Sequence, residues 1–213
     1  MVVQSKPLIF QRKRPQQARS TELVAAILEA AAQVLAAEGA QGFTTARVAE
    51  RAGVSIGSLY QYFPNRESIL FRLQADEWRE TTDLWGSILG DATRPPTVRL
   101  RRLVHAFLRS EIAEAALRNA LDDAAPFYRD ALEAHEIHAE GSQIAETFMR
   151  EALPRTPEAE RGMIGTLIFT TITAVGKEFS ETPGARDDID AHADAMADML
   201  CAYLEDAGRS RPR

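Results

Sequence analysis

Apolar residues recur along this chain at helical spacing. Near the N-terminus, Leu23, Ile27, Ala31, Val34 and Leu35 lie three, four or one residue apart, the stripe of an amphipathic helix, and Gly39 marks its end. Similar stripes follow as far as residue 206, and no run shows the alternation of a half-buried strand. The pattern predicts an all-α protein of about nine helices.

Glycine and proline divide the remaining stripes into separate helices. Pro64, the pair Pro95–Pro96, Pro126, Pro154 and the run 182–184 stand at the breaks. The helices after the first are predicted at about 45–52, 56–63, 65–88, 96–112, 116–125, 127–153, 158–180 and 187–206.

The segment 43–63 predicts a helix-turn-helix. Thr44 and Ser55 are placed to cap two short helices, and Gly53 supplies the left-handed residue that a tight turn between them requires. Ala52 is small enough for the second helix to cross the first closely.

The predicted second helix presents an outward face without charge. Its outward residues are Ile56, Gly57, Ser58, Tyr60, Gln61 and Tyr62. An ordinary solvated helix face carries Lys and Glu, whereas this face suits hydrogen bonding to bases and phosphates in a major groove. Arg66 begins the next helix, where backbone amides also favour a phosphate. The alternative is a helical hairpin whose turn chemistry is coincidental.

Charge is distributed unevenly. The net charge of −6 argues against a nucleic-acid partner, yet residues 1–75 hold 9 Lys/Arg against 5 Glu, whereas residues 76–213 hold 16 against 26 acidic residues. A basic N-terminal third can attract phosphates while the acidic remainder repels them. Residues 1–20 are predicted to be a basic flexible arm, either a solvated tail or a segment that orders on DNA.

Residues 44–70 resemble the signature of the TetR family of bacterial regulators. The resemblance rests on Ala49, Ala52-Gly53-Val54-Ser55, Gly57, Leu59-Tyr60, Tyr62-Phe63 and the stretch 64–67. It implies a homodimer that binds a double-stranded DNA operator, with a helix-turn-helix domain over residues 21–75 and a helical ligand-binding and dimerisation domain over residues 76–213. Thr44, Thr45 and Arg47 would approach the DNA backbone, residues 55–62 would enter the groove, and Tyr62 and Arg66 would hold phosphates.

The resemblance also implies that the C-terminal domain senses a small molecule. Candidate lining residues are Trp85, Phe107, Glu111, Phe127, Phe148 and Thr173. Glu111 falls inside the apolar stripe of its helix, so it needs a partner, either an arginine such as Arg101 or Arg118 or a ligand. A mostly apolar effector that releases a repressor is the expected function, and a constitutive or architectural DNA binder without a ligand is the alternative.

The last two predicted helices resemble the pair that forms a four-helix dimer interface in this family. Residues 162–176 carry no charge, so this helix is suited to burial on more than one side. The candidate interface residues are Gly162, Gly165, Phe169, Met196, Leu200 and Tyr203.

The sequence argues against other classes of protein. It contains no Gly-rich phosphate loop, nucleophile elbow or metalloprotease motif, so neither an enzyme nor a cofactor is expected. His135 and His138 have a spacing compatible with a metal, but no second cluster supports a site. Cys201 is the single cysteine, which fits a cytoplasmic protein, and no membrane association is expected.

Overall fold

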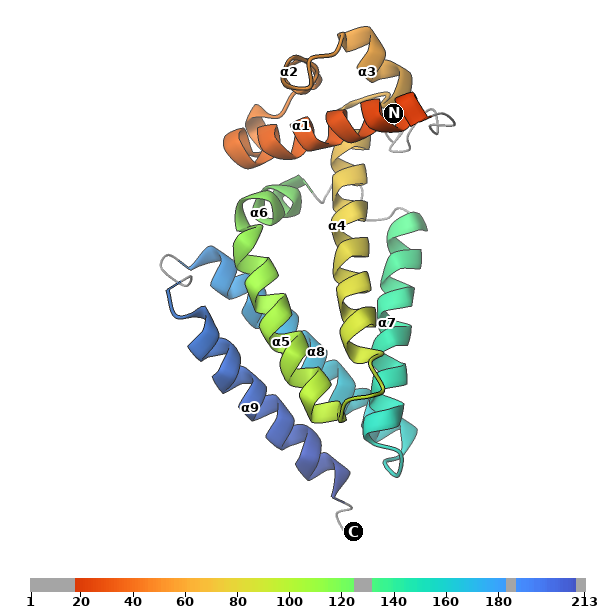
Figure 1. Cartoon of the computed structure of the whole chain (residues 1–213), viewed down its shortest axis with the longest axis vertical. Helices are drawn as coiled ribbons and strands as arrows, with labels where there is room; N and C mark the ends of the chain where they lie inside the picture. The colour runs from red at the N-terminus through yellow and green to blue at the C-terminus, as the bar shows by residue number, and fades with distance from the viewer. Residues whose placement is uncertain (1–17, 125–131, 183–186, 210–213) are drawn as a thin grey trace, which may run out of the picture. The chain divides into compact units, whose positions relative to one another are not determined.

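The computed structural model describes residues 18–124, 132–182 and 187–209, and these form an all-α fold of nine helices, as predicted (Figure 1). The helices are α1 (Ala18–Gly42), α2 (Thr45–Arg51), α3 (Ile56–Tyr62), α4 (Arg66–Leu89), α5 (Pro96–Ala113), α6 (Ala115–Ala124), α7 (Leu132–Ala152), α8 (Glu158–Glu181) and α9 (Ile189–Gly208). The chain divides into two compact units, which are described separately.

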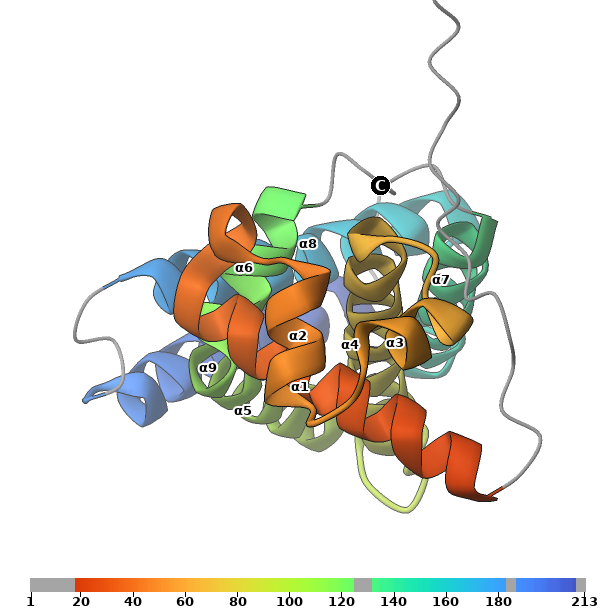
Figure 2. The same ribbon diagram turned by 90° about the horizontal axis from the view of Figure 1, so that it is seen from above.

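The first unit comprises the described residues of 1–77 and 116–134. Here α1 packs on α2, α2 packs on α3, and the first part of α4 continues from α3 (Figures 1 and 2). Fully buried side chains from these helices and their loops form the core: Ile27, Leu35, Phe43, Leu59, Phe63, Ile69 and Leu70. This core holds the two short helices α2 and α3 in place, which are too short to be stable alone.

Helix α1 is the one described helix whose length and apolar content match a membrane span, over Ser20–Gly42. Its apolar residues Val24, Ile27, Val34 and Leu35 are buried inside the first unit. The composition of α1 is therefore accounted for by core packing. Gly39, with φ of 67°, interrupts the helix where the sequence predicts its end.

The second unit comprises the described residues of 78–115 and 135–213. Helix α5 packs against both α8 and α9. The second part of α4 lies beside α7, where a Cβ atom added to Gly86 would be 3.4 Å from Cδ1 of Ile144. Helices α5 and α8 approach closely at Gly176, where a Cβ atom would lie 2.7 Å from Cε1 of Phe107 and 3.1 Å from Cγ of Glu111. A larger residue at this position would force the two helices apart.

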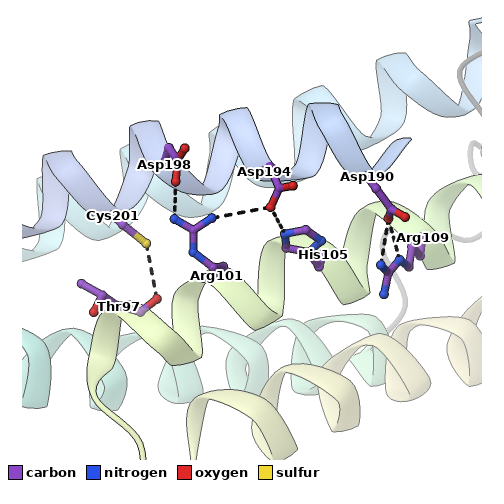
Figure 3. Close-up of polar contacts among 8 residues, drawn as sticks. All are labelled: Thr97, Arg101, His105, Arg109, Asp190, Asp194, Asp198 and Cys201. Atoms are coloured by element: carbon purple, nitrogen blue, oxygen red, sulfur yellow. Dashed lines mark hydrogen bonds and ion pairs between the residues drawn. The ribbon is translucent and has the colours of Figure 1, made fainter. Parts of the chain in front are cut away.

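A seam of polar and charged residues joins α5 to α9 (Figure 3). It consists of Arg101, His105 and Arg109 on α5 and Asp190, Asp194 and Asp198 on α9. His105 Nε2 lies 3.0 Å from an oxygen of Asp194, and Arg109 donates twice to Asp190. Exposed ion pairs each contribute less than about 1 kcal/mol to the free energy of unfolding. The regular four-residue spacing of these pairs therefore matters more for the register of α9 against α5 than for the stability of the fold.

Cys201 lies at the end of this seam, where its thiol donates to the carbonyl oxygen of Thr97 at 3.3 Å (Figure 3). Burial raises the pKa of the Cys201 thiol, although the nearby Arg101 acts in the opposite direction. The hydrogen bond with Asp198 raises the pKa of Arg101, a guanidinium that is already charged at its ordinary value. In the loop before α5, the Thr93 hydroxyl lowers the pKa of Asp91.

Candidate nucleic-acid interface

The turn between α2 and α3 has the geometry that the sequence predicts. Gly53 adopts φ of 66°, its N–H donates to the Glu50 carbonyl at 3.1 Å, and the Val54 N–H donates to the Ala49 carbonyl at 3.0 Å. These bonds satisfy carbonyls at the end of α2 while reversing the chain direction. The two short helices therefore form a helix-turn-helix.

Both short helices begin at side-chain caps, as predicted. The Thr44 hydroxyl accepts the Arg47 N–H at 3.3 Å, and the Ser55 hydroxyl accepts the Ser58 N–H at 3.1 Å. A third cap begins α4, where the Asn65 side chain accepts the Ser68 N–H at 2.8 Å. Each cap satisfies an amide that would otherwise lack an intrahelical partner, so the start of each helix is fixed locally.

Helix α3 exposes most of the residues expected to read DNA. Gly57 and Gln61 are exposed, Ser58 is half-buried, and the side chains of Ile56 and Tyr60 remain 43% and 41% exposed. An exposed face of this composition, without a charged side chain, leaves hydrogen-bonding and apolar groups available to base edges.

The sequence prediction for Tyr62 was wrong. It was expected to face outward, but its side chain is 6% exposed and lies in the core of the first unit with Leu59 and Phe63. Tyr62 follows Leu59 by three residues and therefore shares its inward side of the helix. Its ring belongs to the packing of α3 rather than to the exposed face.

Truncation of this ring provides a test. Tyr62→Ala is expected to lower the free energy of unfolding by about 3 kcal/mol, since it removes a buried aromatic ring, whereas Tyr62→Phe should unfold close to the wild-type midpoint. Urea denaturation followed by circular dichroism measures both variants. A Tyr62→Ala protein as stable as the wild type would mean that the ring lies outside the core.

The residues expected at the DNA backbone lie around the start of α2. Thr44 and Arg47 are exposed, and the Thr45 hydroxyl is 3.0 Å from the Tyr60 hydroxyl of α3, so α2 and α3 are joined on this side. Arg47 forms an ion pair with Glu38 and donates to the Gly42 carbonyl at 3.4 Å. A phosphate contact by Arg47 would exchange these exposed partners, which are held only weakly.

Arg66 is the first residue of α4, as the sequence predicts, and its side chain is 40% exposed. Its Nε atom donates to Glu67 at 2.9 Å. The basic arm over residues 1–20 lies outside the described residues except for its last three positions.

Three of the six predicted ligand-lining residues come together in the second unit. The ring centroids of Trp85 and Phe107 are 5.9 Å apart, and both Trp85 and Phe148 pack against Phe169, at 5.2 and 6.3 Å. We call Trp85, Phe107, Phe148 and Phe169 the aromatic cluster. It joins α4, α5, α7 and α8 in the core.

The other three predicted ligand-lining residues are Glu111, Phe127 and Thr173. Thr173 is exposed, and its hydroxyl donates back to carbonyl oxygens of α8, so it does not line the aromatic cluster. Glu111 is half-buried against Gly176, on the same side of α5 as Phe107 of the aromatic cluster. Phe127 lies outside the described residues.

A pocket of about 440 Å³ opens between α7 and α8. Met149, Gly165 and Phe169 contribute to its lining, with Arg150 and Arg161 among its charged residues. Sequence reasoning missed this pocket, because its residues come from two helices whose facing sides no local pattern reveals. Among the described residues no cluster of metal-ligating side chains occurs, and His138 stacks on Trp78 at 4.8 Å.

Most of the expected interface residues lie inside the protomer. Met196 and Leu200 are buried, and Gly165 is covered by Met149, whose Cγ would lie 3.1 Å from an added Cβ atom. Phe169 and Tyr203 are half-buried, and only Gly162 is exposed. The apolar stripe of α9 is buried because α9 packs on α5 of the same chain.

The same two helices expose other apolar residues. Met163 and Leu167 on α8 are 62% and 53% exposed, and Met199 on α9 is 56% exposed. Met163 and Leu167 are four residues apart and therefore lie on one side of α8. We call Met163, Leu167 and Met199 the exposed methionine-leucine set.

Comparison with known proteins agrees with this architecture. Residues 27–73 match the family model of "Bacterial regulatory proteins, tetR family", and residues 95–207, more than half of the chain, match the "Tetracyclin repressor-like, C-terminal domain". No curated protein matches the sequence.

Solved structures share the fold at low sequence identity. FadR from Bacillus subtilis, solved in complex with stearoyl-CoA, has a TM-score of 0.64 at 18% identity, covering 84% of this chain and 98% of its own. The fatty acid degradation regulator FadR from Bacillus halodurans has a TM-score of 0.60 at 19% identity, and the match covers 94% of this chain and 100% of that one. AlkX from Dietzia, implicated in biodegradation of n-alkanes, has a TM-score of 0.53 at 20% identity, and the match covers 85% of this chain and 97% of that one.

The helix-turn-helix followed by a larger helical domain defines a DNA-binding transcriptional regulator. The chain belongs to the TetR family, whose members are regulators rather than enzymes.

Proposed function

We propose that this regulator binds a palindromic operator as a homodimer and is released from it by a mostly apolar effector. The observation that carries the DNA-binding part is the uncharged exposed face of α3, which follows a capped tight turn. Ser55, Ile56, Gly57, Ser58, Tyr60 and Gln61 would enter the major groove. Thr44, Thr45, Arg47 and Arg66 would contact the backbone.

Dimerisation through α8 and α9 is supported by the exposed methionine-leucine set. Large apolar side chains exposed together mark surfaces that associate. A twofold interface uses the same patch twice, so Met163 and Leu167 of one subunit would face the same residues of its partner. Such a dimer would carry two α3 helices, one for each half-site of a palindrome. The proposed location of such a regulator is the cytoplasm.

The effector part is supported by the aromatic cluster and the adjacent pocket. A volume of about 440 Å³ lies within the range of small-molecule sites. FadR from Bacillus subtilis is described in complex with stearoyl-CoA, and AlkX is implicated in biodegradation of n-alkanes. Both suggest that apolar chains are the first compounds to test. An effector acts only to the extent that it prefers the weakly binding conformation.

Thermal melts with stearoyl-CoA, stearate and dodecane test the effector. At 100 times its dissociation constant a ligand adds about 2.7 kcal/mol of stability, which raises the melting temperature of a chain this size by roughly 5–10 °C. The same compound should then release bound DNA in an anisotropy assay. If no compound in the series raised the melting temperature or released DNA, a constitutive binder would be the better account.

A further inference from the structure

The indole nitrogen of Trp85 is buried and has no hydrogen-bond partner among the described residues. A tryptophan N–H that is removed from water normally finds an acceptor, because an unmade hydrogen bond to a buried donor is costly. Trp85 therefore carries a hydrogen-bond donor without an acceptor inside the second unit.

Two phenylalanine rings pack on the Trp85 ring. Phe169 packs over the Trp85 ring with an interplanar angle of 31°, and Phe107 meets it edge-on at 83°. Phenylalanine rings offer no oxygen acceptor, so neither neighbour satisfies the indole N–H. Any strong acceptor must come from a molecule that is placed beside the ring.

Phe169 connects Trp85 to the surface. The ring that stacks on Trp85 also lines the pocket between α7 and α8, together with Met149 and Gly165. Phe169 therefore belongs both to the aromatic cluster and to the wall of the pocket, and it is half-buried.

We propose that the Trp85 indole N–H binds a carbonyl oxygen of an apolar ligand that enters through the α7–α8 pocket, past Phe169. This inference rests on the proposed effector function and specifies its ligand class. The rings of the cluster would pack against the apolar body of the ligand, while the single donor selects molecules that carry an acceptor. A pure hydrocarbon would fill the same space and leave the N–H unsatisfied.

Propiophenone and propylbenzene test the donor, because they differ only by a carbonyl group in place of a methylene. The full-length protein is expected to bind propiophenone about tenfold more tightly than propylbenzene, a ratio typical of one hydrogen bond. In Trp85→Phe, which keeps an aromatic ring but removes the N–H, the ratio should fall to about one. Trp78→Phe is the matched control, since Trp78 stacks on His138 outside the aromatic cluster, and should keep the tenfold ratio.

Nuclear magnetic resonance of the ¹⁵N-labelled wild-type chain gives an independent measurement. The chain has two tryptophans, so the indole signal of Trp85 is identified by its loss in Trp85→Phe. Saturating propiophenone should move this proton signal downfield, whereas propylbenzene should not, and the result does not depend on the stability of any variant.

Three outcomes would overturn the inference. They are an unchanged affinity ratio in Trp85→Phe, a Trp85 signal that stays in place when propiophenone saturates the protein, and the failure of both compounds to bind. In each case, release of operator DNA by stearoyl-CoA or another compound would leave the proposed function standing.

Discussion

Gly57→Glu is expected to lower the affinity for operator DNA more than a hundredfold while leaving the protein folded. Gly57 is exposed on α3, and an added Cβ atom would meet nothing closer than the Ser55 hydroxyl at 3.9 Å. Replacing glycine inside a helix also favours the helical conformation. A carboxylate in the groove faces the phosphates, and juxtaposed like charges cost several kcal/mol, which is more than a hundredfold in affinity.

Fluorescence anisotropy of a labelled operator duplex measures this loss, and thermal unfolding checks the fold. Ala36→Glu is the matched control, because it adds the same charge at an exposed position of α1 in the same unit. Operator affinity equal to that of the wild type in Gly57→Glu would show that α3 does not enter the groove.

The double variant Met163→Glu/Leu167→Glu is expected to convert the proposed dimer to monomers. Both side chains are largely exposed in the isolated chain, so the substitutions should leave the protomer fold intact. In a twofold interface four carboxylates would be brought together, and unpaired charges that are buried there cost several kcal/mol each. A monomer binds one half-site at a time, so operator affinity should fall at least a hundredfold.

Sedimentation velocity measures the oligomeric state of this variant. Val98→Glu, at another exposed apolar position in the second unit, is the control and should remain a dimer. A soluble dimer of normal operator affinity in the double variant would place the interface on another surface.

The local features of the DNA-binding domain could be predicted from the sequence because short-range chemistry determines them. Gly53 is the residue that tolerates a left-handed turn, and Thr44, Ser55 and Asn65 each cap the helix that follows. Neighbouring residues supply all of these contacts. The burial of Tyr62 could also have been predicted, because its spacing from Leu59 places both on one side of α3.

The contacts between helices of the second unit could not be predicted in the same way. The stripe of Met196 and Leu200 indicates a buried face of α9, but periodicity does not reveal whether the covering helix belongs to the same chain or a partner. The structure places that stripe on α5. On α8, Ile168 and Ile172 define the buried side, which turns Thr173 toward solvent and Phe169 toward Trp85.

Selection of bound fragments from a pool of random DNA shows whether the protein reads a DNA sequence through α3. The wild-type chain should enrich an inverted repeat, with affinity for the recovered duplex that falls steeply as salt rises. Gly57→Glu should enrich nothing, and Gln61→Ala should alter the preference at particular bases of each half-site. Recovery of no common sequence by the wild type, or of the same repeat by Gly57→Glu, would contradict DNA reading through α3.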